Sequence, residues 1–459
     1  MPTIAADLAG FPATGLADWE ALLAKTGTSR EALTSRTLDG LQIAPLYAPA
    51  KGRRLGRAPG AAWDLRVIVR HPDPASAHAQ IHEALEGGAS SILLVLGREG
   101  VTGLAIAGES GFSGLLEGVV LEAARIALDA GFAGPEATVW LAAAAKASPR
   151  ARLAFHLDPL GERARLGDGE EPLEDCLRSA GRCAASFAET YPEASFFFAS
   201  GRVLHEAGAS EAQELAFAAA SLIAYARVLA AAGLPIKAAL PRIAIGLCVD
   251  ADVFGSIAKL RAARLIVRRI ATALGAAAHG PVEARSSERM LTRASPWTNQ
   301  VRLTAAGFSA AVGGADVIEL GAYSDPFGAP DAQARRLSRN ISVILSEEAG
   351  IGLVADPASG SGALEAMTGE LARAAWAKLQ EIEASGGASA ALSSGLVGSW
   401  VEASREGLRA EIAAGERRVL GVTDFPSRTI EVEVEAPTAP TAKAGADALR
   451  AIRLEDLAR

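Results

Sequence analysis

The chain has 459 residues and a formal net charge of −8, because 53 aspartates and glutamates outnumber 45 lysines and arginines. This balance disfavours a nucleic-acid partner, since binding to a phosphate backbone needs clustered basic side chains. The length exceeds one ordinary domain of about 100–200 residues, but a single α/β barrel of about 250 residues with flanking segments accounts for it. Half of the residues are hydrophobic and only 5% are aromatic, which favours a helix-rich protein with much alanine.

The sequence predicts neither a membrane span nor a secreted protein. The longest apolar stretch, residues 215–232, is interrupted by Ser221, Tyr225 and Arg227 and falls short of the roughly 20 apolar residues that cross a bilayer. Residues 1–7 show no basic region followed by an apolar stretch, so no secretory signal is visible. The expected location is the cytoplasm.

Residues 1–60 are predicted to form an N-terminal arm, a candidate partner-binding segment, rather than a domain. They contain one short helix signal at residues 18–25, a turn at Asp39-Gly40 and an extended stretch at residues 43–47. The basic, glycine-containing stretch at residues 51–57 is typical of an exposed loop, with a phosphate contact as the alternative.

Short aliphatic runs then alternate with long alanine-rich stretches. Several runs are almost continuously apolar, which is typical of parallel strands covered by helices on both faces. Strand and helix in alternation predict an α/β fold, a (β/α)8 TIM barrel over residues 61–425. The expected strands are residues 65–70, 90–96, 118–121, 137–141, 152–156, 194–199, 242–247 and 316–320.

The stretches between these runs have helical periodicity and suitable start and stop residues. Two more helices after the last strand are expected to pack outside the barrel. The remainder, residues 426–459, is predicted to hold a strand-like piece at 430–435, a proline-containing linker at 437–441 and a short helix at 443–459. The expected helices are residues 74–85, 173–189, 211–231, 253–274, 299–312 and 332–348, followed by 364–383 and 392–414.

No familiar short motif assigns a chemistry. Residues 350–355 match a dinucleotide-binding pattern but follow a helix instead of a strand. His78 and His82 have a spacing that holds a metal if a carboxylate joins them, but a solvated helix face is the simpler interpretation. The three cysteines, at positions 176, 183 and 248, lack metal-type spacing and are expected to be reduced thiols. We therefore predict no metal site.

Residues 200–209 read Ser-Gly-Arg-Val-Leu-His-Glu-Ala-Gly-Ala. This stretch resembles the methylmalonyl-CoA mutase family, whose catalytic chains read Ser-Gly-Tyr-His-Met-Gln-Glu-Ala-Gly-Ala there. The resemblance covers roughly residues 40–425, and its further matches lie at residues 258–264, 296–299, 339–340, 346–351, 355–357, 360–361 and 418–422.

The resemblance implies a barrel that binds acyl-CoA along its axis, beneath a separate cobalamin domain placed over the carboxyl ends of the strands. The tyrosine-histidine pair that faces the substrate falls on Arg202 and Val203, so its polar role is lost. The radical-shielding tyrosine should lie within residues 57–63, which contain none. Asp158 aligns with a substrate-contacting glutamine, and Arg242 matches an arginine that helps to hold CoA.

On this resemblance, the chain is similar to the small, non-catalytic subunits of the family and lacks the cobalamin-binding domain, because no Asp-x-His-x-x-Gly motif occurs. It implies a heterodimer with a large catalytic subunit that holds adenosylcobalamin and isomerises methylmalonyl-CoA and succinyl-CoA. This chain would bind no cofactor and carry no catalytic residue. The alternative is an independent barrel enzyme acting on another acyl-CoA, with His156, Asp158, Arg202 and His205 around the strand ends.

Overall fold

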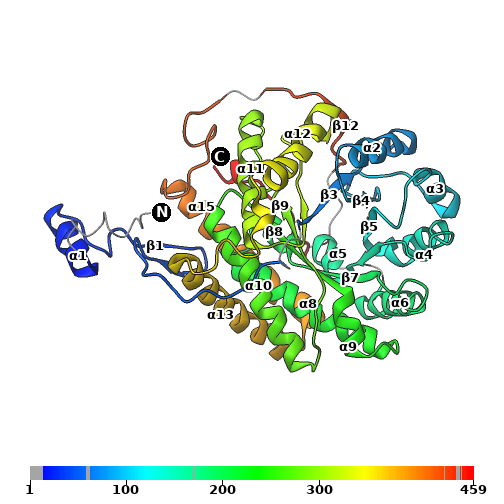
Figure 1. Ribbon diagram of the computed structural model, residues 1–459, viewed down its shortest axis with the longest axis horizontal. Helices are drawn as coiled ribbons and strands as arrows, with labels where there is room; N and C mark the ends of the chain where they lie inside the picture. The colour runs from blue at the N-terminus through cyan, green and yellow to red at the C-terminus, as the bar shows by residue number, and fades with distance from the viewer. Residues whose placement is uncertain are drawn as a thin grey trace, which may run out of the picture.

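In the computed structural model, which describes residues 14–57, 62–167, 169, 171–427, 430–440, 445 and 447–458, parallel strands close into an eight-stranded barrel ringed by helices (Figure 1). The predicted (β/α)8 barrel is confirmed. Neighbouring strands follow the order β10-β3-β4-β5-β6-β7-β8-β9. Their bounds are β3 (Asp64–Val69), β4 (Ser91–Val95), β5 (Arg125–Asp129), β6 (Leu153–Leu157), β7 (Ser195–Ser200), β8 (Ile243–Val249), β9 (Val282–Ser286) and β10 (Val317–Glu319).

Six of the predicted strands are confirmed and two are wrong. Residues 118–121 form a turn ahead of β5, which the sequence analysis missed. Residues 137–141 lie inside helix α4 (Gly134–Ala144), although Thr138 and Val139 favour a strand. A helix is nevertheless favoured, because Pro135 is well tolerated in a first helical turn and the last three residues of α4 are alanine, the strongest helix former.

Strand β9 was also missed, because it reads Val-Glu-Ala-Arg-Ser and carries two charges in five residues. Glu283 and Arg285 alternate with the apolar Val282 and Ala284, as the two-residue period of a strand requires. The charged pair faces the barrel interior, where Glu283 is 1% exposed. A buried charge of this kind requires a partner inside the barrel.

Helices cover the outside of the barrel, and each of the six predicted between strands is present. Among the described residues, α8 (Glu211–Ala231) is the only helix long and apolar enough to cross a membrane by those two measures. It packs against β7, β8 and a neighbouring helix, and 67% of its most apolar window is buried, as in a core helix. The other α-helices described from residue 74 as far as residue 343 are α2 (Pro74–Glu86), α3 (Gly108–Leu115), α5 (Pro159–Leu166), α6 (Leu173–Ser186), α7 (Arg202–Glu206), α9 (Ile236–Ala239), α10 (Val253–Ala273), α11 (Pro296–Gly313) and α12 (Ala332–Val343).

The two helices predicted after the barrel are present as α13 (Gly362–Ala384) and α15 (Leu396–Ala413), with the short α14 (Ala388–Ser393) between them. Helix α13 packs against α8 and α10 on the outside of the barrel. At the other end of the chain, α1 (Leu16–Lys25) has no buried residue and stands away from the barrel at the left of Figure 1. The short strands β1 (Ser35–Arg36) and β2 (Gln42–Ile43) follow it and pair antiparallel.

The C-terminal part of the chain lies against the barrel mouth, the end where the parallel strands terminate. Strand β12 (Val434–Pro437) pairs antiparallel with β11 (Gly328–Pro330). Residues 447–458, the C-terminal strap, donate backbone hydrogen bonds to the carbonyls of Ala164, Glu206 and Arg289, which follow β6, β7 and β9.

The predicted helix over residues 443–459 is therefore wrong for most of its described part, and only α16 (Leu454–Leu457) is helical. The strap's amides at Leu449, Ile452 and Leu454 donate instead to carbonyls in α5, in α7 and after β9, so these groups do not depend on helical hydrogen bonds. The predicted linker begins at Pro437, which belongs to β12, and ends at Thr441, which lies outside the described residues.

Candidate functional site

A buried ion-pair network fills the axis of the barrel. Arg66, in the middle of β3, donates from Nη1 to Glu283 Oε2 at 2.5 Å and to Glu319 Oε1 at 3.1 Å. Its Nε donates to Ser91 Oγ at 2.8 Å. The three charged side chains are at most 1% exposed. Burial acts to lower the pKa of Arg66, but the two carboxylates outweigh it and hold this pKa above its usual range.

Glu319 is shared by three guanidiniums. Besides Arg66, it accepts from Arg202 Nη1 at 2.9 Å and from Arg285 Nε at 2.7 Å. Burial opposes ionisation of this carboxyl, yet the neighbouring guanidiniums hold the pKa of Glu319 below its usual range. The network thus places three positive charges on the two carboxylates of Glu283 and Glu319. These axial residues were missed as a site, although arginine within the apolar run at 65–70 was a visible signal.

The ring of Phe198 packs against two residues next to this network, Arg202 and His156. Arg202 lies over the ring of Phe198, 4.7 Å from its centroid, and His156 stacks on the same ring at 4.4 Å. His156 Nε2 is 3.4 Å from Glu283 Oε1. The φ of His156 is +46°, a left-handed conformation that is strained for a residue other than glycine. The pairing of β6 with β7 shifts register between Ala154 and Leu157 at this point.

A cavity of about 360 Å³ lies above the stacked residues, at the carboxyl ends of the barrel strands. Among the residues proposed from sequence, His156, Asp158, Arg202 and Val203 line it. His205 does not line it. The four residues expected around the strand ends of an independent enzyme therefore do not all share this cavity. The C-terminal strap closes part of the cavity with Leu449, Ala451 and Arg453.

Two hydrogen bonds hold the Asp158 carboxyl group in place. It caps the N-terminus of α5 by accepting from the Gly161 amide at 3.0 Å, and the Tyr225 hydroxyl donates to it at 2.5 Å. Burial raises the pKa of Asp158 to about 7, and these two hydrogen bonds offset only part of that effect. The carboxyl therefore titrates near neutral pH.

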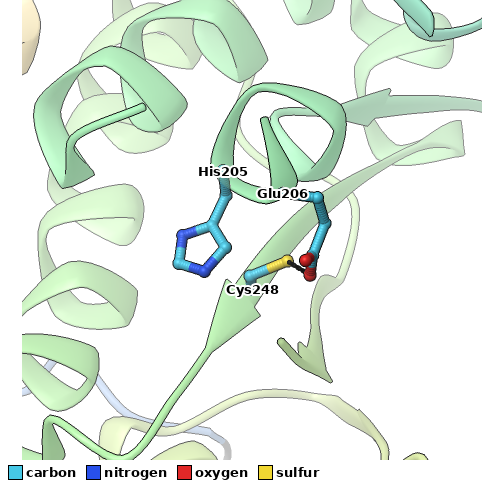
Figure 2. A group of neighbouring side chains, drawn as sticks. All are labelled: His205, Glu206 and Cys248. Atoms are coloured by element: carbon cyan, nitrogen blue, oxygen red, sulfur yellow. Dashed lines mark hydrogen bonds between the residues drawn. The ribbon is translucent and has the colours of Figure 1, made fainter. Parts of the chain in front are cut away.

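His205 belongs to a second, largely buried cluster, which shares Glu206 with the lining of the cavity. Figure 2 shows it beside Glu206 and Cys248, a group whose ligand atoms lie within 4.8 Å of one another. Glu206 accepts from the backbone amides of Glu288 at 2.9 Å and Arg289 at 2.8 Å, and Cys248 Sγ donates to it at 3.3 Å. Burial first, and then the Glu206 carboxylate, keeps the pKa of the Cys248 thiol well above its usual range.

A buried ammonium group neutralises the acidic side of this cluster. Lys259 Nζ donates to Glu214 Oε2 at 2.6 Å and also pairs with Glu211. His205 Nδ1 lies 3.3 Å from Glu214 Oε2, and its Nε2 bonds Ser287 Oγ at 2.9 Å. Burial lowers the pKa of His205 well below its usual value, so the ring is neutral. A protonated thiol and a resident ammonium do not favour a metal ion here.

The remaining candidate residues are engaged locally. Arg242 immediately precedes β8, at the opposite end of the barrel from the cavity, and donates to the Ala188 carbonyl at 3.1 Å. His78 and His82 stand edge to face at 4.5 Å, and each ring bonds a backbone carbonyl. Residues 58–61, where a shielding tyrosine was sought, lie outside the described residues.

Together, these elements define a (β/α)8-barrel protein whose cavity lies where barrel enzymes place their active sites. The family model for methylmalonyl-CoA mutase matches residues 81–457. The chain belongs to the methylmalonyl-CoA mutase family.

Three relatives carry the name of one subunit type. The methylmalonyl-CoA mutase small subunit of Streptomyces virginiae is 38% identical over 445 residues, which are 92% of this chain and 70% of that protein. A probable small subunit of Mycobacterium tuberculosis is 36% identical over 77% of this chain and 60% of its own length. The small subunit of Propionibacterium freudenreichii subsp. shermanii is 31% identical, over 90% and 67%. The chain thus spans between 60% and 70% of the length of these relatives.

Proposed function

We propose that the chain is the small, non-catalytic subunit of a heterodimeric, adenosylcobalamin-dependent methylmalonyl-CoA mutase. In this proposal, a large partner subunit isomerises methylmalonyl-CoA and succinyl-CoA, and the present chain supports that subunit structurally. The names of the relatives, which call them small subunits, support a partner of this kind.

The ion-pair network along the barrel axis is the main observation in support of a non-catalytic role. An acyl-CoA lying on the axis would have to displace Arg66, Glu283 and Glu319, which hold one another at 2.5–3.1 Å. Removing one partner of a buried ion pair costs about 3–5 kcal/mol. The residues at the family's tyrosine-histidine positions, Arg202 and Val203, supply neither a phenol nor an imidazole.

The mouth of this barrel does not fit a corrin ring. The C-terminal strap crosses the loops after β6, β7 and β9, where the family resemblance places cobalamin. Arg453 on the strap donates to the Glu288 carbonyl at 3.0 Å, and the Glu455 carboxylate accepts from the Arg293 amide at 2.9 Å. We therefore assign the coenzyme to the partner and derive no chemical step for this chain.

The N-terminal arm and the outer helices are the proposed contact surfaces. Helix α1 is amphipathic in sequence yet exposes Leu16 and Leu22, which are 50% and 62% accessible. A helix that buries none of its apolar residues gains little from its own chain, because most helical stability comes from packing an apolar face. A partner surface over α1 would supply that packing.

Co-expression with the large mutase subunit of the same organism tests this function. We expect the two chains to co-elute in size-exclusion chromatography with the mass of a 1:1 complex. Mutase turnover should require the large subunit, and the present chain alone should show none. Separate elution of the two chains, or turnover by this chain alone, would overturn the proposal. Turnover of another acyl-CoA by the chain alone would favour the independent enzyme instead.

A further inference from the structure

We propose that two copies of the chain pair through the exposed face of helix α11, antiparallel to each other and about a two-fold axis. The residues on that face, here called the α11 stripe, are Trp297, Val301, Thr304 and Phe308. This pairing concerns the full chain without a large subunit, so it does not rest on the proposed function. Because the complex proposed above contains one copy of each chain, the large subunit would replace the second copy there.

The α11 stripe is uncharged along its whole length and open to solvent. Trp297 and Val301 are 55% and 68% exposed, and Thr304 and Phe308 are exposed as well. Other sides of the helix pack against α10 and α12. The outward face of a helix in a soluble protein usually carries charged and polar side chains. An apolar outward face is therefore typical of a helix that another chain covers.

Neighbouring segments extend the apolar surface at both ends of the stripe. The short helical segments η4 (Ile344–Glu348) and η5 (Ile351–Leu353) contact α11, and each exposes an apolar side chain, Ile344 and Leu353. Near the N-terminal end of α11, Arg302 Nη2 donates to the Leu420 carbonyl at 2.9 Å, and the Leu420 side chain is exposed. The surface available to a partner is thus wider than one helix.

The spacing of the stripe selects a second copy as the occupant. Its members are four, three and four positions apart, which is the spacing of helices that pack lengthwise against each other. This spacing reads the same in both directions. An antiparallel copy of α11 would therefore place Trp297 opposite Phe308 and Val301 opposite Thr304, twice in each pair. A patch that is complementary to itself is what a two-fold dimer requires.

The charges at the two ends of the stripe favour the same arrangement. At the N-terminal end, Arg302 bonds only neutral groups among the described residues, and the exposed Arg418 lies 3.7 Å from Asp424. At the C-terminal end, Glu347 and Glu348 are exposed and form no ion pair within the described part of the chain. An antiparallel pair brings the basic end of one copy to the acidic end of the other, whereas a parallel pair opposes like charges.

Sedimentation velocity of the full chain alone, from about 1 to about 100 µM, tests the pairing. We expect wild type to shift from the mass of one chain to twice that mass. Val301→Glu introduces two charges at the centre of the contact and should weaken pairing by about tenfold or more. Val139→Glu is the matched control, because Val139 is an exposed valine on α4, and it should leave pairing unchanged. Circular dichroism checks that both variants are folded.

A charge exchange tests the antiparallel orientation. Arg418→Glu, and separately the double variant Glu347→Lys with Glu348→Lys, should each weaken pairing by about tenfold, because like charges then meet at both ends. An equal mixture of these two variants should pair like wild type, because opposite charges again meet at both ends. The proposal is overturned if wild type keeps the mass of one chain at about 100 µM, if folded Val301→Glu pairs like wild type, or if the mixture pairs no better than either variant alone.

Discussion

Substitution of Glu319 by glutamine probes the axial network directly, because it keeps the shape of the side chain and removes its charge. In the native chain this carboxylate accepts from Arg66, Arg202 and Arg285 at distances between 2.7 and 3.1 Å. In Glu319→Gln, only Glu283 remains to balance three buried guanidiniums. We expect the free energy of unfolding to fall strongly.

The magnitude follows from the cost of an uncompensated buried charge. Removing one partner of a buried pair costs about 3–5 kcal/mol, and Glu319 serves three partners, so the upper end of that range is expected. This is a large share of a total stability of about 5–15 kcal/mol. Arg202→Met should cost less than Glu319→Gln, because it removes the excess cation and leaves two guanidiniums on two carboxylates.

Urea unfolding followed by circular dichroism measures these differences as shifts of the midpoint at constant slope. Glu402→Gln is the matched control, since that side chain is 67% exposed and pairs only with Arg405 in the described residues; it should change stability by less than about 0.5 kcal/mol. The reasoning is refuted if Glu319→Gln lies within about 1 kcal/mol of wild type, or if Arg202→Met is the more damaging of the two.

Three other measurements address separate parts of the structure. Because the pKa of Asp158 is raised to about 7, the folded chain holds a proton that the unfolded chain has released above pH 4. Stability should therefore fall as pH rises from about 4 to about 7, and Asp158→Asn should flatten the urea midpoint over that interval, whereas parallel profiles would contradict this assignment. Deletion of residues 1–34 should leave the unfolding of the barrel unchanged, because α1 buries no residue, but should weaken the complex with the large subunit in sizing experiments; a lower midpoint would show that the arm supports the barrel. Cys248 is buried with a thiol pKa well above its usual range, so Cys248→Ala should leave the rate of native thiol modification at pH 8 unchanged; a slower rate would place this thiol at the surface.

The sequence predicted those strands whose apolar character is continuous, such as residues 194–199, and those helices with clear caps. Helix α8, for example, begins at Ser210 with a capping box completed by Gln213. Strands β5 and β9 escaped because they carry charged residues within five positions. Periodicity cannot reveal that such charges are buried and paired, so the total of eight strands was correct although two were misplaced.

The functional site was only partly predictable. The resemblance to the mutase family drew attention to Arg202 and Val203. Of the four residues expected around the strand ends, His156, Asp158 and Arg202 line the cavity. The sequence shows Arg66 within an apolar run, but it does not show its partners, which lie 217 and 253 residues later in the chain. Likewise, nothing in the local sequence shows that the ring of His205 lies against Glu214 and Ser287 instead of lining the cavity. Nor does it show that the C-terminal strap lies over the barrel mouth.

The most direct test of the central claim is a turnover assay of the purified full chain with methylmalonyl-CoA and adenosylcobalamin, without any large subunit. The structure gives this barrel a closed, ion-paired axis, so no succinyl-CoA should form above the level of a blank without protein. Formation of succinyl-CoA in proportion to the concentration of this chain would contradict the account.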